Sequence, residues 1–146
     1  MQVSRTCGFT VDQALAAMRA MVRADMEAAG AEIPADDAAL AGITYSKQLT
    51  NRMGKPERAT VTVETLDETG YCVRFDSRYG ANTVTYAFSP RADGALDVTY
   101  EESFEGATSS TGISHRLFAT LTGRGNRKRM EAQLERLEQY ILAQGV

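Results

Sequence analysis

Carboxylates near the end of a predicted strand are the first residues that could do chemistry. Glu101 and Glu102 are adjacent, and Glu105 follows them in the same segment. Paired carboxylates can serve as general acid and general base. Neighbouring strand residues point to opposite faces of a sheet, however, so Glu101 and Glu102 cannot easily share one site. We expect Glu101 to meet solvent, and Glu102, which continues the apolar alternation of its strand, to lie on the packed face.

Lys47 is a second charge at a comparable position, because it is in phase with Tyr45 and Leu49 in another predicted strand. A charge on the packed face needs a partner or a place at the mouth of a cavity. One prediction is therefore a Lys47–Glu102 ion pair. The alternative is that both charges lie at the rim of the sheet.

The six tyrosines fall mostly on the packed faces of the predicted strands. They could line an apolar pocket with polar hydroxyls, or they could pack in the core with each hydroxyl hydrogen-bonded. The pocket interpretation names Tyr45, Tyr86 and Phe88, with Leu134 facing them from a helix.

The basic segment GRGNRKRM, residues 123–130, lacks the spacing of a Walker loop and the third glycine of a dinucleotide-binding fingerprint. A projection onto an ideal helix places Arg127 and Lys128 at the edges of a buried stripe and Arg129 on the far side. Arg127 and Lys128 could seat an anion if Asn126 caps a new helix. Alternatively, both side chains extend over the sheet edge and pair with acidic residues.

Two apolar stripes flank this segment. Ile113, Leu117 and Leu121 form the first, and the second consists of Met130, Leu134, Leu137 and Ile141. On one ideal helix the stripe centres would lie roughly 150° apart. We therefore expect a kink or break between residues 122 and 126, or a separate partner for the first stripe.

The remaining reactive side chains give no catalytic or metal-binding pattern. The only histidine, His115, precedes a helical segment, and the two cysteines, Cys7 and Cys72, have no metal-like spacing. We expect free thiols, no metal and no cofactor.

Regular elements that could position these residues follow from periodicity. We predict a strand over 2–9, a helix over 11–30 and a short helix or turn over 33–42. Strands are expected over 43–49, 59–66, 71–77, 82–88 and 95–104, followed by a helical C-terminal third. Thr10 and Gln13 form a capping box, Gly30 suits a helix stop, and three methionines, Met18, Met21 and Met26, are expected in the core. Short glycine-containing connections predict an antiparallel meander in an α+β fold.

Length and composition favour one domain over residues 1–146. The chain is 43% hydrophobic and 24% charged, and no run approaches the roughly 18 apolar residues of a membrane span. The first residues lack a signal-peptide core, so we expect a cytoplasmic protein without membrane contact. The net charge of −3 divides into +3 over residues 113–146 and −6 over the remainder. This mild asymmetry argues against nucleic-acid binding.

The order of these elements resembles the helix-grip fold of the START and polyketide-cyclase-like superfamily. More narrowly, ITYSKQLTNRMGKPERATVTV, YGANTVTYAF and VTYEESFE resemble a family of small bacterial proteins of unknown function. The resemblance spans nearly the whole chain and implies a curved antiparallel sheet of about six strands around a long or kinked C-terminal helix, with a possible cavity between them. It carries over no catalytic residue.

These observations favour a protein that binds a small amphipathic or anionic ligand without catalysis. The expected ligand-binding residues are Tyr45, Lys47, Tyr86, Phe88, Glu102, Arg127 and Lys128. The alternative is an interaction or homodimerisation module that uses the apolar surface of Ile113, Leu117, Phe118 and Leu121. An enzyme is a weaker third hypothesis.

Overall fold

The computed structural model describes residues 2–50, 54–106 and 109–144, with residue 106 and residues 109–126 described by their backbone alone. The elements in chain order are β1 (Gln2–Cys7), α1 (Val11–Ala28), a 3-10 turn η1 (Asp37–Ala39), β2 (Thr44–Thr50), β3 (Pro56–Asp67), β4 (Gly70–Ser77), β5 (Gly80–Pro90), β6 (Leu96–Gly106) and α2 (Ser109–Gln144). This order confirms the predicted α+β class. Between residues 33 and 42 the only regular element is this 3-10 turn. Of the two predicted alternatives, a short helix or a turn, the structure has the turn.

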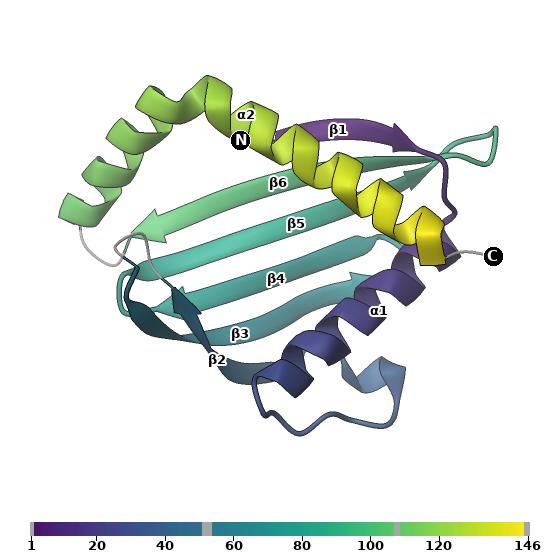
Figure 1. The fold of residues 1–146 in the computed structure, drawn as a ribbon, viewed down its shortest axis with the longest axis horizontal. Coiled ribbons are helices and arrows are strands. Elements are labelled where there is room, and N and C mark those ends of the chain that lie inside the picture. The colour runs from purple at the N-terminus through teal and green to yellow at the C-terminus, as the bar shows by residue number, and fades with distance from the viewer. Residues whose placement is uncertain (1, 51–53, 107–108, 145–146) are drawn as a thin grey trace.

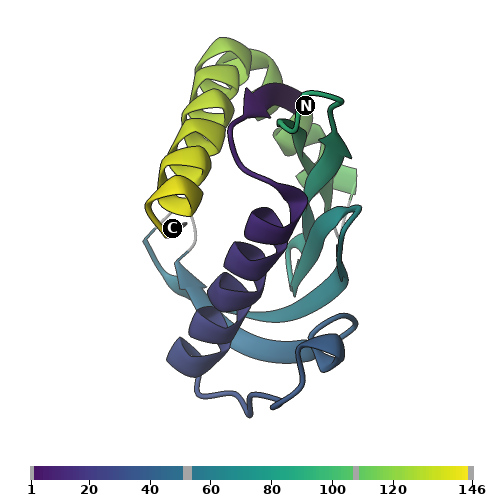
Figure 2. The same cartoon turned by 90° about the vertical axis from the view of Figure 1, so that its right-hand side faces the viewer.

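A single antiparallel sheet has the strand order β1-β6-β5-β4-β3-β2. β2 to β6 follow one another as the predicted meander, and β1 pairs with β6 to complete the sheet. Both helices lie on the same side of this sheet (Figures 1 and 2). α1 contacts β3 and β4, whereas α2 contacts β1 and β6. β5 therefore runs beneath the space between the two helices.

The ends of α1 are set by local chemistry. The Gln13 amide donates to Thr10 Oγ1 at 3.2 Å, and the Thr10 amide donates to Gln13 Oε1 at 2.9 Å, which confirms the capping box. Beyond the helix, Gly30 has a φ of 73°, a left-handed conformation that favours glycine.

Met18 and Met26 are buried as predicted, but Met21 is 38% exposed. The prediction was wrong for Met21 because that residue lines a gap between α1 and α2 rather than packing on the sheet.

α2 is one continuous helix that changes direction midway along its length (Figure 1). The predicted interruption is therefore a bend and not a break. Its C-terminal half buries the second predicted stripe against the sheet; the residues are Met130, Leu134, Leu137 and Ile141. The side chains of Ile113, Leu117, Phe118, Leu121 and His115 lie outside the described residues.

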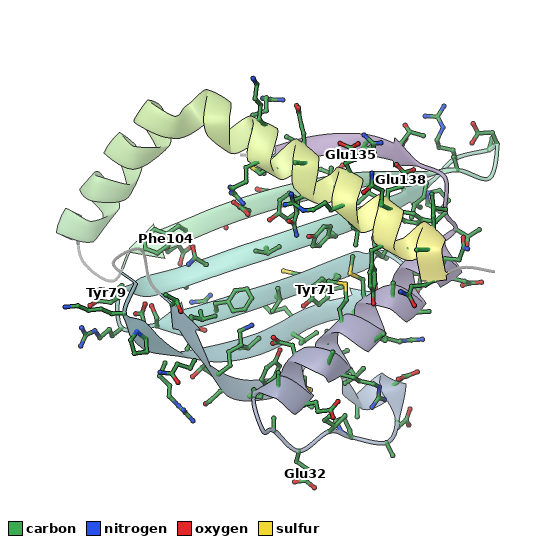
Figure 3. All side chains as sticks on the ribbon, viewed as in Figure 1. Glu32, Tyr71, Tyr79, Phe104, Glu135 and Glu138 are labelled. Carbon is green, nitrogen blue, oxygen red and sulfur yellow. The ribbon has the colours of Figure 1, made fainter. Side chains whose placement is uncertain are left out.

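A carboxylate fixes the C-terminal half of α2 to the first strand. Glu138 accepts a hydrogen bond from the Arg5 side chain at 2.9 Å and another from the Gly8 amide at 2.8 Å (Figure 3). Burial alone would raise the pKa of Glu138, but these two donors hold the pKa below its ordinary value. Both cysteines, Cys7 and Cys72, are free thiols, as predicted.

Candidate functional site

A groove separates α1 from α2 above the middle of the sheet. The cavity within it measures about 510 Å³. We call it the α1/α2 groove and define it by its lining residues, which are Met21, Ala24, Asp25, Ala28, Tyr86, Gln133, Arg136, Leu137 and Tyr140.

The walls of the α1/α2 groove are mostly apolar. Ala24 and Ala28 lie one turn apart on α1 and are too short to reach α2, so space remains between the helices. Met21 and Tyr140, on opposite sides of the groove, are 38% and 41% exposed. Large apolar side chains exposed together on both walls are typical of a ligand-binding cleft.

The floor and one end of the groove are polar. The Gln133 amide Nε2 donates to the Tyr86 hydroxyl at 3.5 Å, and Arg136 donates to Gln133 Oε1 at 3.0 Å. No carboxylate lies within ion-pair distance of Arg136 in the part of the chain that the structure describes. The groove thus offers a hydroxyl, an amide and an uncompensated positive charge, linked through the side chain of Gln133.

Tyr86 belongs to a row of tyrosines on the helix-covered face of the sheet. Tyr71, Tyr86 and Tyr100 are directly opposite one another on β4, β5 and β6. Their ring centroids are 6.1 Å apart for the first pair and 4.8 Å for the second. Burial raises the pKa of all three hydroxyls, so each is neutral at physiological pH and can donate or accept a hydrogen bond.

Asp25, which lines the groove, has two partners from β2. Lys47 Nζ donates to Asp25 Oδ1 at 2.9 Å, and the Tyr45 hydroxyl donates to Oδ2. Burial and this hydrogen bond to a carboxylate raise the pKa of Tyr45. Lys47 also lies 5.4 Å from the centre of the Phe75 ring. The charge of Asp25 is therefore already compensated within the protein.

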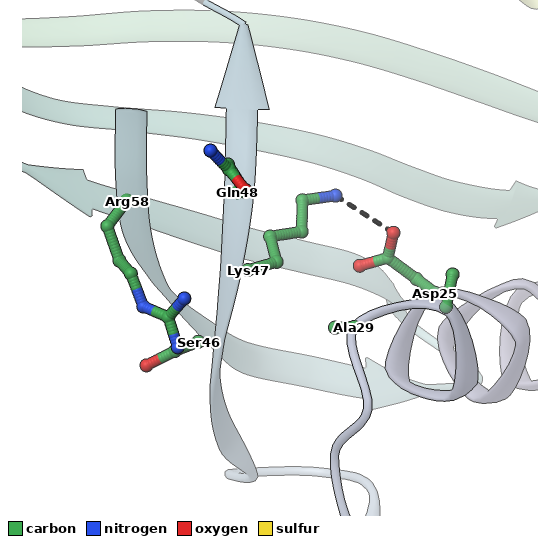
Figure 4. Close-up of a pocket in the computed structure, with 7 residues that line it drawn as sticks. Asp25, Ala29, Ser46, Lys47, Gln48 and Arg58 are labelled. Atoms are coloured by element: carbon green, nitrogen blue, oxygen red, sulfur yellow. Dashed lines mark hydrogen bonds and ion pairs between the residues drawn. The ribbon is translucent and has the colours of Figure 1, made fainter. Parts of the chain in front are cut away.

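A polar side pocket adjoins the groove at Asp25 and Ala28. It measures about 300 Å³ and also contacts Ala29, Ser46, Lys47, Gln48 and Arg58. Figure 4 shows Lys47 reaching to Asp25 on one side of β2, with Arg58 on β3 near Ser46. The polar character of the site thus increases toward the C-terminal end of α1.

Glu102 is the centre of a second charged cluster, between β6 and α2. Its carboxylate accepts from the Tyr100 hydroxyl and, through both oxygens, from the Arg129 guanidinium; the Nη1–Oε1 distance is 3.1 Å. Burial alone would raise the pKa of Glu102, but the hydrogen bonds from Arg129 and Tyr100 outweigh burial, so the pKa lies below its ordinary value.

Comparison with known proteins gives the family. A domain of unknown function (DUF3284) matches residues 1–123, most of the chain. The chain belongs to the DUF3284 family. No curated protein sequence matches it.

Three solved structures share the fold of this DUF3284 chain. Ara h 8.0201 has a TM-score of 0.58 at 10% identity, with 98% of this chain and 97% of the other covered. SA2116 from Staphylococcus aureus, a protein of unknown function, has a TM-score of 0.56 at 14% identity and coverages of 96% and 93%. TTHA0849 from Thermus thermophilus has a TM-score of 0.54 at 15% identity and coverages of 100% and 99%. At these identities the likeness shows the fold alone, which is the helix-grip architecture expected from the sequence.

The predicted Lys47–Glu102 pair is wrong. Lys47 is on β2 and Glu102 on β6, and three strands separate them in the sheet. Four inter-strand steps of about 4.8 Å amount to about 19 Å, far beyond an ion pair. Each charge instead pairs with the helix above it, Lys47 with Asp25 of α1 and Glu102 with Arg129 of α2.

The predicted orientations on α2 are only partly correct. Arg129 is half exposed, as expected of a residue facing solvent, but its guanidinium reaches the sheet at Glu102. Arg127 and Lys128, expected to lean toward the protein body, are exposed. A helical projection places only the Cβ atom, and the long arginine side chain can bend sideways to a buried-side carboxylate that needs a partner.

The other predicted ligand-binding residues divide into two groups. Tyr86 lines the α1/α2 groove, and Tyr45 and Lys47 reach it through Asp25. Phe88 and Leu134 are buried in the core at 7% and 1% exposure. The sequence reasoning missed Asp25, Gln133, Arg136 and Tyr140. Their only signal was their position beside the buried stripes of α1 and α2, which many surface residues share.

Substitution of Glu102 by glutamine should change the acid stability of the fold. Because the folded-state pKa of Glu102 is lowered, its ionised form stabilises the fold above the unfolded-state pKa of about 4.5 and loses that effect as pH falls through the folded-state value. The free energy of unfolding of wild type should exceed that of Glu102→Gln by about 1 kcal/mol at neutral pH. This difference should disappear under acid conditions. Urea unfolding of both proteins at neutral and acid pH measures this. An equal gap at both pH values would contradict the Arg129–Glu102 contact.

The described ranges contain no group of three or more His, Cys, Asp and Glu side chains placed to hold a metal ion. Nor does any helix within them combine the length and apolar character needed to cross a membrane.

Proposed function

We propose that this chain binds a small anionic amphipathic molecule in the α1/α2 groove and releases it chemically unchanged. The apolar part of the ligand would lie against Met21, Ala24 and Leu137. Its anionic head would lie at Arg136, within reach of Gln133 and the Tyr86 hydroxyl.

One observation carries this proposal: Arg136 provides an uncompensated positive charge, among the described residues, at an apolar-walled cavity of about 510 Å³. Asp25 also lines the cavity, but Lys47 and Tyr45 already bind its carboxylate, so it does not cancel the charge of Arg136. Ligand cavities in proteins are typically about 300–1,000 Å³, mostly apolar, with a few polar groups that orient the ligand. The groove fits this description in both size and composition.

The groups in the groove favour binding over covalent chemistry. The raised pKa of Tyr86 keeps its hydroxyl neutral, so it can donate a hydrogen bond to an anion without transferring its proton. Gln133 and Arg136 can both donate hydrogen bonds to an anion. Burial of the apolar part of the ligand would supply most of the affinity, and Arg136 would select the charge.

Two probes with the same alkyl chain and opposite charges test the proposal. Decanoate should bind more tightly than decyltrimethylammonium in isothermal titration calorimetry, and added salt should weaken decanoate binding. Arg136→Gln should weaken decanoate binding roughly threefold to tenfold, the range of a charge-assisted contact at an exposed arginine. Arg136→Glu should reverse the preference between the probes.

Arg78→Gln is the matched control, because Arg78 contacts Tyr79 away from the groove. The expectation from the sequence that Arg127 and Lys128 seat the anion makes a different prediction. If Arg127→Gln and Lys128→Gln weaken decanoate binding while Arg136→Gln does not, the anion site lies on α2 near its bend and the groove proposal fails. The alternative function, a partner surface at Ile113, Leu117, Phe118 and Leu121, remains a prediction.

A further inference from the structure

We infer that the ligand of the α1/α2 groove carries a linear alkyl chain, and that Tyr140 sets the length of chain that can be buried. This inference rests on the proposed function and adds a ligand class and a specificity-determining residue. It starts from a second cavity, of about 260 Å³, at the other end of the helix pair. Its lining residues are Gln13, Ala16, Ala17, Ala20, Tyr140, Ile141 and Gln144.

The two cavities lie in line between the same two helices. Along α1, the second cavity uses residues 13–20 and the first uses residues 21–28. Along α2, the order is reversed: the first cavity extends from Gln133 to Tyr140 and the second from Tyr140 to Gln144. Together they follow α1 over about 22 Å, at 1.5 Å of rise per residue.

Tyr140 is the one described residue that contacts both of these cavities. Its ring therefore lies between them and ends the first cavity on that side. The ring is 41% exposed and makes no side-chain hydrogen bond or ring contact within the described residues, so little holds it in place. Its removal would join the two cavities into one long groove.

The shape and polarity of the joined groove select a linear chain. Arg136, in the first cavity, is the only cation among the described residues that line the two. Beyond Tyr140 the lining consists of three alanines and Ile141 together with the side chains of Gln13 and Gln144, so it is mostly apolar and carries no charge. A ligand with its anionic head at Arg136 can therefore extend an unbranched apolar tail along α1 toward Tyr140. A compact ring system would fill the first cavity and gain nothing from the second.

A chain-length series tests this inference separately from the proposed function. Calorimetry with hexanoate, octanoate, decanoate, dodecanoate and tetradecanoate, each below its micelle concentration, should show wild-type affinity rising with length and then levelling off where the chain meets Tyr140. In Tyr140→Ala the rise should continue past that length. The gain should be about fourfold for each further methylene buried, the fold-change equivalent to about 0.8 kcal/mol.

Two variants serve as controls. Tyr140→Phe keeps the ring and should reproduce the wild-type length profile. Tyr79→Ala removes an equally exposed tyrosine at the end of the sheet away from Glu138 and should also leave the profile unchanged (Figure 3). If Tyr140→Ala and wild type level off at the same length while Arg136→Gln still weakens decanoate, the chain-length inference is wrong and the proposed function stands. If no carboxylate binds wild type, both are wrong.

Discussion

Gly70→Ala is expected to destabilise the fold by about 2–5 kcal/mol, as the sum of steric overlap and backbone strain. A Cβ atom at Gly70 would lie 2.1 Å from the carbonyl oxygen of Tyr86 on β5, and the φ of Gly70 is +152°. Backbone on a central strand cannot move aside as a flexible side chain can. Urea or thermal unfolding measures the loss.

Gly94→Ala is the matched control for this prediction. Gly94 also has a positive φ, +89°, but an added Cβ would meet nothing within 4 Å. Its free energy of unfolding should therefore fall only by the strain of a left-handed alanine, about 1–2 kcal/mol. Equal losses in the two variants would mean that β4 and β5 do not approach each other at Gly70 as described, and that Tyr71 and Tyr86 are not held side by side.

Leu134→Ala is expected to lower the free energy of unfolding by about 2–5 kcal/mol, the usual range for deleting a buried leucine. Leu134 is 1% exposed, in the middle of the stripe that docks α2 onto the sheet. The α1/α2 groove depends on this docking, because α2 supplies one of its walls. We therefore expect decanoate affinity to fall together with stability.

Leu142→Ala provides the comparison within the same helix. Leu142 is 46% exposed, so its truncation should change stability by no more than about 0.5 kcal/mol. If the two leucine variants unfold at the same denaturant concentration, the buried face of α2 has been assigned incorrectly, and the groove would lose one wall.

Most of the fold could be predicted from the sequence because its signals are local. Strict apolar alternation located the five strands of the meander, and the Thr10–Gln13 pair located the start of α1 to the residue. The phase difference between the two stripes of α2 correctly indicated a change of direction. It could not distinguish a break from a bend, because a helix can curve without losing its hydrogen-bonded backbone.

The candidate site was less predictable because its contacts are long-range. The alternation of side chains along each strand correctly placed Lys47 and Glu102 on the helix-covered face. The order of the strands in the sheet, however, puts the two residues four inter-strand spacings apart. The partners of both charges come from helices, and helix position over a sheet is set by packing rather than by any short motif. Arg136 and Tyr140 lie beside a buried stripe and resemble ordinary surface residues until α1 is placed opposite them.

The most direct test of the central claim is amide NMR shift mapping of the isotope-labelled protein during titration with decanoate. We predict concentration-dependent shifts for groove residues of both helices, including Ala24, Ala28 and Leu137, with a smaller response in Arg136→Gln. Amides at Thr62 on β3 and Glu101 on β6, two strands that contribute no lining residue to the groove, should not shift. Shifts confined to the outer face of the sheet or to the N-terminal half of α2, or no shifts at all, would contradict the claim that the α1/α2 groove is the ligand site.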